Sequence, residues 1–92
     1  MTSDNVQIIN ETGLHLKPAA VFCEEALKYE SLITFSIGSY TGNAKSILSV
    51  LAGCVKKGDY IRITCNGSDE EAALEALKKI VENGLGENGE ND

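Results

Sequence analysis

Hydrophobic residues repeat along the chain with two different periods, and their alternation restricts the folds that the chain can adopt. Four short segments show the β-branched or alternating pattern of half-buried strands, and they span residues 6–9, 32–37, 40–42 and 60–65. Three segments carry apolar residues at helical spacing, and they span residues 16–28, 46–54 and 68–82. Because each pattern leaves one apolar face, the order β-α-β-β-α-β-α predicts an α/β (α+β) open-faced two-layer sandwich, with three helices on one face of a four-stranded antiparallel sheet.

The ends and buried faces of the helices follow from the same patterns. The first helix is expected to bury its apolar residues at positions 16, 19, 20, 23, 26 and 27. A capping box at residues 68–71, headed by Ser68, predicts the start of the last helix, which should run to about Glu82. Residues from Gly84 onward are expected to form a polar, frayed tail. We therefore predict one domain over residues 1–86 and a flexible tail over residues 87–92.

The composition excludes several classes of protein. The 92-residue chain has no apolar stretch near the roughly 20 residues of a membrane span and no visible secretory signal. Its net charge is −6, and residues 69–92 account for all of it with eight acidic and two basic side chains. Such a chain is not expected to bind nucleic acid. The cysteines at positions 23, 54 and 65 fit neither a disulfide framework nor a CxxC metal site, so we expect a reduced, cytoplasmic protein without a metal.

His15 is the only histidine, and it lies where the first predicted helix begins. Pro18 is tolerated only in the first turn of a helix, so the helix must begin within about three residues before it. This places His15 at or beside the N-cap, where the free backbone N–H groups of Leu16 and Lys17 would form a small anion site. A neutral imidazole is a nucleophile, and these groups with the Lys17 ammonium could stabilise an attached phosphoryl group. The alternative is an exposed histidine that begins a helix by chance.

The segment from Gly13 to Ala19, GLHLKPA, resembles the active-centre signature of the HPr family. Members of this family are histidine-containing phosphocarriers of the phosphoenolpyruvate-dependent sugar phosphotransferase system. The resemblance continues at residues 45–48 (KSIL) and 57–58 (KG), and it covers residues 6–85. The family fold has the same β-α-β-β-α-β-α order.

The resemblance implies a role for each matching residue. His15 would be phosphorylated on Nδ1 by enzyme I and would pass the phosphoryl group to enzyme IIA domains, without a cofactor. Pro18 and the amides of Leu16 and Lys17 would shape this site, and Ser46 matches a serine that an ATP-dependent HPr kinase/phosphorylase modifies. The implied partner-docking residues lie on the first two helices: Ala20, Ile47, Leu48 and Leu51. The chain would be a monomeric phosphoryl-transfer component, not a stand-alone enzyme.

Two positions differ from the family pattern. Lys17 stands where the family usually has an arginine two residues after the histidine. An ammonium keeps the positive charge but lacks the planar fork with which a guanidinium binds phosphate. The glycine that usually ends the second helix is displaced, because Cys54 follows Gly53.

Other functions remain compatible with the same residues. A regulatory HPr paralogue would act mainly through phosphorylated Ser46 and a catabolite-control transcription regulator, and Lys17 leaves this alternative open. A metal-binding ferredoxin-like module is disfavoured because the sequence has no CxxC pair. Ser46 also has a purely structural interpretation, since a serine before Ile47 and Leu48 is an ordinary helix N-cap.

Overall fold

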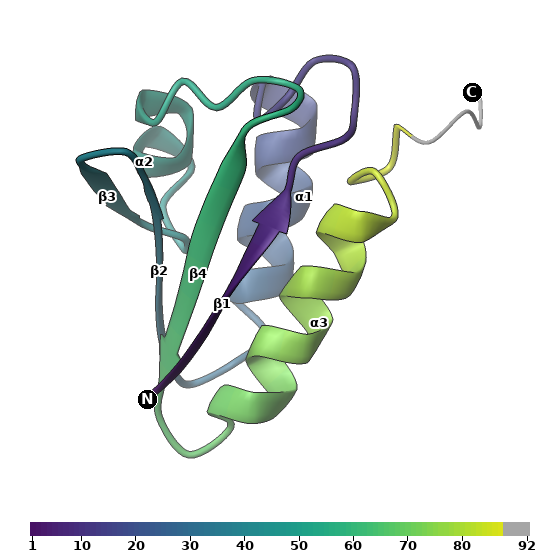
Figure 1. The fold of residues 1–92 in the computed structure, drawn as a ribbon. Coiled ribbons are helices and arrows are strands. Elements are labelled where there is room, and N and C mark those ends of the chain that lie inside the picture. Colours follow the sequence, from purple (N-terminus) through teal and green to yellow (C-terminus); the bar gives the residue numbers. More distant parts are fainter. Residues whose placement is uncertain (88–92) are drawn as a thin grey trace.

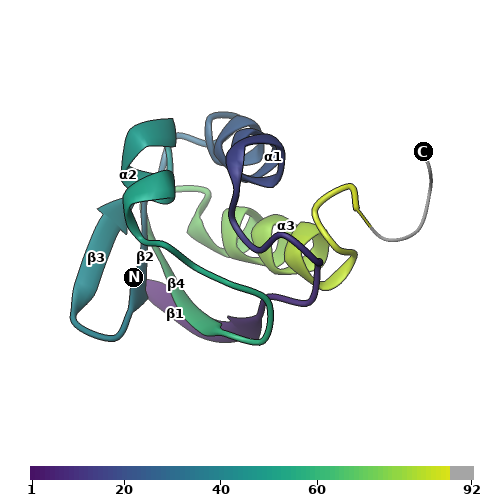
Figure 2. The ribbon, with the colours of Figure 1, turned by 90° about the horizontal axis from the view of Figure 1, so that it is seen from above.

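The computed structural model describes residues 1–87, and its elements follow the predicted order (Figure 1). They are β1 (Thr2–Gln7), α1 (Leu16–Ala26), β2 (Leu32–Ile37), β3 (Tyr40–Asn43), α2 (Ile47–Ala52), β4 (Tyr60–Asn66) and α3 (Glu70–Glu82). The strands form one antiparallel sheet in the order β1-β4-β2-β3. The helices all cover one face of this sheet, as the view from above shows (Figure 2), so the predicted open-faced sandwich is confirmed. No helix within residues 1–87 is long and apolar enough to cross a membrane.

Strand pairing brings the buried side chains of the sheet onto the face that the helices cover. Phe35 of β2 pairs with Ile63 of β4, and Val6 of β1 pairs with Ile61. All four side chains are buried. Phe22 of α1 packs edge-on against Phe35, with ring centroids 6.0 Å apart. This burial fixes α1, and with it the N-terminal end of the helix, on the sheet.

The first strand begins earlier than the hydrophobic pattern predicts. The expected strand covered residues 6–9, whereas β1 spans Thr2–Gln7 and pairs with β4 along its whole length. The polar residues are included because a strand is held by its backbone groups, whatever side chains it carries. Ile8, beyond the strand, instead exchanges backbone hydrogen bonds with the turn at residues 58–59.

The buried face of α1 also differs from the predicted one. Leu16 and Leu27 are 60% and 59% exposed, although both were expected in the core. Phe22 is fully buried, although it was not among the residues expected there. The buried residues of the helix are Pro18, Ala19, Phe22, Cys23 and Ala26. Their spacing of three and four residues defines a stripe that excludes Leu16, in the first turn, and Leu27, at the C-cap.

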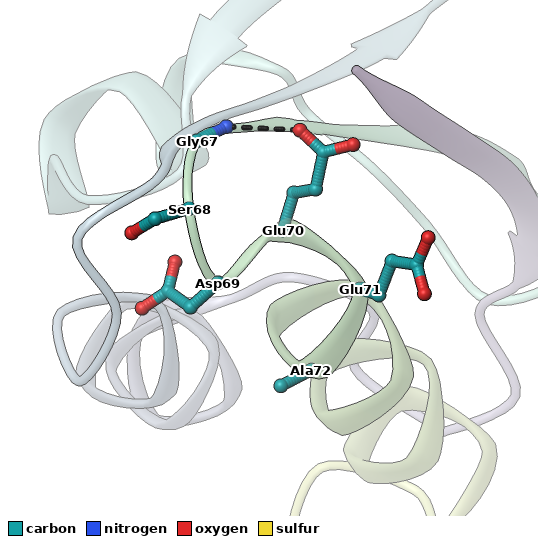
Figure 3. Close-up of a pocket in the computed structure, with 6 residues that line it drawn as sticks. All are labelled: Gly67, Ser68, Asp69, Glu70, Glu71 and Ala72. Atoms are coloured by element: carbon teal, nitrogen blue, oxygen red, sulfur yellow. Dashed lines mark hydrogen bonds between the residues drawn. The ribbon is translucent and has the colours of Figure 1, made fainter.

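Helix α3 begins at Glu70, one residue later than a capping box headed by Ser68 would start it. Its N-cap is Asp69 instead of Ser68, and the Asp69 side chain does not cap its own helix. It accepts hydrogen bonds from the backbone N–H groups of residues 30–31, at 2.8 and 3.0 Å. The Glu70 carboxylate reaches back to the N–H of Gly67 at 3.0 Å (Figure 3). The start of α3 is thus tied to the chain before β2, a contact that no local pattern contains.

Helix α3 ends in a Schellman motif, which anchors the residues after it. Leu85 N–H donates to the carbonyl of Ile80 at 2.9 Å, and Gly84 N–H donates to that of Val81 at 3.0 Å. Gly84 has a φ of +87°, and Leu85 is 2% exposed. The expectation of a frayed tail from Gly84 is therefore wrong for residues 84–87. The rest of the predicted tail, residues 88–92, lies outside the described residues.

Candidate functional site

His15 is the N-cap residue of α1, where the sequence placed it. Its backbone is extended, with φ −84° and ψ −172°, and its carbonyl accepts a hydrogen bond from Ala19 N–H at 2.7 Å. Its side chain is exposed and makes no capping hydrogen bond. Pro18 lies buried in the first turn, where a backbone N–H would have no helical carbonyl to bind, so the helix loses no hydrogen bond to the proline. The imidazole ring is therefore presented to solvent at the positive end of a helix.

The first turn of α1 offers unpaired donors beside His15. Leu16 and Lys17 are the first two helical residues, so their N–H groups have no helical carbonyl to bind. Neither N–H donates to any other group within residues 1–87. The exposed Lys17 side chain adds a positive charge, and the helix dipole acts in the same direction. This turn can hold an anion next to the His15 ring.

The loop before His15 is fixed against the connection between α2 and β4. Leu14 is buried, and its N–H donates to the carbonyl of Val55 at 3.0 Å. Gly13 has a φ of +65°, and a Cβ at this position would collide with the same carbonyl oxygen. Glycine is therefore required both by the backbone angle and by the close approach. These contacts set His15 beside the end of α2.

A carboxylate from the far end of the described chain holds the other side of this loop. Glu87 accepts hydrogen bonds from Asn10 Nδ2 at 3.1 Å and from Thr12 Oγ1 at 3.0 Å. The bond from Asn10 is the main cause that holds the pKa of Glu87 below its ordinary value, and the charge of Lys17 acts in the same direction. Sequence reasoning predicted none of Asn10, Thr12 and Glu87 as site residues. Asn10 and Gly13 have the composition of a turn, but no local signal links Glu87 to it.

His15 lines an open depression of about 310 Å³ between the start of α1 and the chain that follows α2. The other lining residues are Thr12, Leu14, Leu51, Cys54, Val55 and Lys56. Of the four predicted docking residues, Leu51 is the one that shares this depression with His15. Leu48 is 77% exposed on α2, and Ile47 and Ala20 are half-buried outside the depression.

Ser46 is the N-cap of α2, and its predicted capping role is confirmed. Its Oγ accepts a hydrogen bond from Ser49 N–H at 3.3 Å. The ammonium of the neighbouring Lys45 donates to the carbonyl of Tyr29 at 2.6 Å, so this charge is engaged within the fold. Ser46 does not line the depression that contains His15.

Cys54 adopts the left-handed conformation that follows the end of α2. Its φ is +53°, whereas Gly53 before it stays right-handed at φ −70°. Helix α2 consequently ends at Ala52, earlier than the predicted end at residue 54. The left-handed region costs a residue other than glycine about 1–2 kcal/mol. The displaced glycine thus leaves backbone strain at a residue that lines the depression.

We expect Cys54→Gly to stabilise the protein by about 0.5–1 kcal/mol. Relief of about 1–2 kcal/mol of strain outweighs the roughly 0.5–1 kcal/mol of extra backbone entropy that glycine loses on folding. The side chain of Cys54 is exposed, so its removal takes little from the core. Denaturant unfolding measures the change, and Cys54→Ala is the matched control because alanine keeps the strain. A glycine variant no more stable than the alanine variant would show that the strain is absent.

The chain is similar in sequence and structure to proteins of one family. The family model described as "PTS HPr component phosphorylation site" matches residues 2–83. Phosphocarrier protein HPr of Mycoplasma capricolum subsp. capricolum is 40% identical over 74 residues, which cover 80% of this chain and 83% of that protein.

Solved structures agree with the sequence match. HPr-C-His from Thermoanaerobacter tengcongensis superposes with a TM-score of 0.92 at 37% identity, covering 95% of this chain and 98% of that one. The Bacillus subtilis catabolite repression protein Crh gives a TM-score of 0.74 at 32% identity, with coverage of 91% and 97%. Because the family model and these relatives span most of the chain, the protein belongs to the HPr family, the phosphocarriers of the sugar phosphotransferase system.

Proposed function

We propose that the protein carries a phosphoryl group on His15 between a donor and acceptor proteins of the phosphotransferase system. The observation that carries this proposal is the exposed imidazole of His15 at the N-cap of α1, beside two unpaired backbone N–H groups. Membership in the HPr family, through a family model described as a phosphorylation site, supports the same role. His15 is the one histidine that the chain offers.

The proposed transfer is a displacement at phosphorus. The lone pair of a His15 ring nitrogen, Nδ1 in the family, forms a bond to phosphorus while the bond to the donor breaks and its electron pair leaves with the donor. In the onward step, the acceptor forms the new bond and His15 recovers its electron pair. The N–H groups of Leu16 and Lys17 and the Lys17 ammonium stabilise the charge of the phosphoryl group. Pro18 holds the turn that presents them.

Enzyme I is the proposed donor and enzyme IIA domains are the proposed acceptors, all in the cytoplasm. The exposed Leu48, with Ala20, Ile47 and Leu51, offers them an apolar docking surface on α1 and α2. The net negative charge falls on residues 69–92, and residues 1–68 balance six acidic with six basic side chains. An acidic partner is therefore not repelled by the segment that carries His15. We propose a monomer without a cofactor, and neither nucleic acid nor a membrane as a partner.

A relay assay tests this function. The protein is incubated with enzyme I and labelled phosphoenolpyruvate, separated from both, and then mixed with an enzyme IIA domain. We expect acid-labile, base-stable label on the protein, followed by its transfer to the enzyme IIA domain. Absence of label under conditions that charge a standard HPr would contradict the carrier function and favour the regulatory paralogue.

The regulatory paralogue is supported by two observations. Ser46 is half-exposed at the N-cap of α2, and the structure of Crh superposes on most of the chain. In this alternative an HPr kinase/phosphorylase modifies Ser46, and the product binds a catabolite-control transcription regulator. The presence of His15 with two unpaired amides beside it favours the carrier.

Ser46 is also the proposed regulatory phosphosite of the carrier, and Ser46→Asp mimics its modification. We expect this variant to raise the KM of enzyme I for the protein about tenfold, because the new charge lies beside Ile47 and Leu48 and repels an acidic partner. The melting temperature should stay equal or rise, since aspartate caps a helix as well as serine does.

The matched control for this experiment is Asn66→Asp. It introduces an exposed carboxylate at the end of β4 that leads to α3, away from α2 (Figure 1). Its KM is expected to match that of the parent protein. Unchanged enzyme I kinetics in Ser46→Asp would leave Ser46 with its capping role alone.

A further inference from the structure

The segment after α3 folds back onto the loop that leads to His15. Glu87, the last described residue, forms hydrogen bonds with two residues of this loop that lie 75 and 77 positions earlier in the sequence. Its Oε1 lies 3.1 Å from Asn10 Nδ2 and 3.4 Å from the backbone N of Thr12, and both carboxylate oxygens lie 3.0 Å from Thr12 Oγ1. A charged carboxylate that accepts from three donors is tied to the loop by several hydrogen bonds at once.

The backbone of the same segment keeps Glu87 at this position. The Schellman motif turns the chain at Gly84, and the buried Leu85 anchors it in the core. Glu87 N–H then donates to the carbonyl of Gly84 at 2.9 Å. The position of the Glu87 carboxylate is thus set by a folded turn whose backbone is hydrogen-bonded to the end of α3.

Glu87 binds the two residues that shape the loop. Asn10 is buried, its Nδ2 also donates to the carbonyl of Gly13 at 2.7 Å, and Gly13 N–H donates back to the carbonyl of Asn10 at 3.2 Å. Thr12 lines the depression that contains His15, whereas Glu87 does not. Glu87 therefore acts on the site through its hydrogen bonds to Asn10 and Thr12, and its charge also interacts with that of Lys17.

We propose that Glu87 is a positioning residue for phosphoryl transfer: its carboxylate fixes the loop from Asn10 to Gly13 and so the orientation of His15 toward its partners. This inference rests on the proposed function of His15. The bond between Leu14 and Val55 and the ion pair between Glu11 and Lys57, at 2.7 Å, brace the loop toward the connection between α2 and β4. Glu87 supplies the hydrogen bonds to Asn10 and Thr12 from the side of α3. In-line transfer needs the reacting atoms aligned, and a displacement of about 1 Å can cost about 100-fold in rate.

The carboxylate is in its charged form at neutral pH. Hydrogen bonds from Asn10 and then Thr12, with the nearby charge of Lys17, hold the pKa of Glu87 below its ordinary value, and burial opposes them. Because the pKa is lower in the folded than in the unfolded chain, the contact stabilises the fold above the unfolded-state pKa. This stabilisation is lost as the pH falls through the folded-state pKa.

Steady-state phosphorylation by enzyme I, with the full chain as substrate, tests the proposal. Glu87→Gln removes the charge at nearly constant size, and Thr12→Val removes the hydroxyl donor at nearly constant shape. We expect kcat to fall about three- to tenfold in both variants. KM should change by less than about twofold, because the docking residues of α1 and α2 are untouched. Thr12→Ser, which keeps the hydroxyl, should recover most of the rate lost in Thr12→Val.

The matched control for the charge is Glu82→Gln, since Glu82 is exposed in the last turn of α3. It removes one carboxylate from the same end of the molecule and should leave kcat and KM at the parental values. Parental kcat in Glu87→Gln, while the parent protein is phosphorylated normally, would overturn the positioning role. A parent protein that enzyme I does not phosphorylate contradicts the proposed function, and the positioning role falls with it.

A second measurement detects the contact itself, independently of phosphoryl transfer. In proton–nitrogen correlation spectra recorded as the pH is lowered, the amide resonance of Thr12 should follow the protonation of Glu87. This response should disappear in Glu87→Gln and persist in Glu82→Gln. A Thr12 resonance that ignores Glu87 in the parent protein would show that the contact is absent and would overturn the proposal.

Discussion

His15→Ala is expected to abolish phosphorylation by enzyme I and phosphoenolpyruvate while the protein remains folded. Alanine removes the chain's one imidazole, and with it the nucleophile. The helix start should survive, because Ala19 N–H bonds to the backbone carbonyl at position 15 and the His15 side chain makes no capping bond. Exposed substitutions of this kind usually change stability by less than about 0.5 kcal/mol. Label incorporation and thermal unfolding, measured on the same preparation, check both expectations.

Two results of this experiment would have opposite meanings. A folded variant without label supports His15 as the phosphoryl acceptor. Label incorporated at the parental rate would assign the acceptor to another residue and remove His15 from the mechanism. The parent protein, treated in parallel, shows that the donor enzyme is active.

Lys17→Glu is expected to slow phosphoryl transfer to an enzyme IIA domain about 100-fold. The exposed ammonium is the side-chain cation beside the two unpaired amides of the first turn, and glutamate replaces its attraction for the phosphoryl group by repulsion. Lys17→Arg should transfer at least as fast as the parent protein, because a guanidinium binds phosphate through a planar fork. The measurement is the single-turnover rate of phosphoryl transfer to the enzyme IIA domain from the phosphorylated parent protein and from each phosphorylated variant.

The control for the change of charge is Lys79→Glu. Lys79 is exposed in the last turn of α3, so this variant changes the net charge equally without altering the first turn of α1. We expect transfer within about twofold of the parental rate, because Lys79 does not line the depression that contains His15 and the effect of an exposed surface charge is weakened by water and salt. Parental transfer in Lys17→Glu would make Lys17 a bystander and leave the backbone amides as the stabilising groups.

Much of the fold could be predicted because the spacing of apolar residues along the sequence matches the spacing of buried residues in each helix or strand. In β4 the structure buries Ile61, Ile63 and Cys65 and exposes Tyr60 and Arg62, which is the alternation read from the sequence. The first strand was predicted less well because its polar N-terminal half is recruited by pairing with β4, about sixty residues away. Periodicity describes which face is apolar and contains no information on pairing partners.

The same division applies to the candidate site. His15 could be placed at the helix start because Pro18 restricts where α1 begins, and Ser46 because serine is a preferred N-cap. Glu87 could not be predicted, since its contact with Asn10 and Thr12 exists only once α3 has packed and its Schellman turn has formed. A site residue that acts through tertiary contacts leaves no local pattern.

The most direct test of the central claim is to locate the phosphoryl group within the parent protein. The protein is incubated with enzyme I and phosphoenolpyruvate, kept at alkaline pH to preserve phosphohistidine, digested, and sequenced by tandem mass spectrometry. The account predicts a phosphoryl group on His15, in the peptide that contains GLHLKPA, and its loss after brief acid treatment. A phosphoryl group on any other residue, or an acid-stable phosphoryl group, would contradict it.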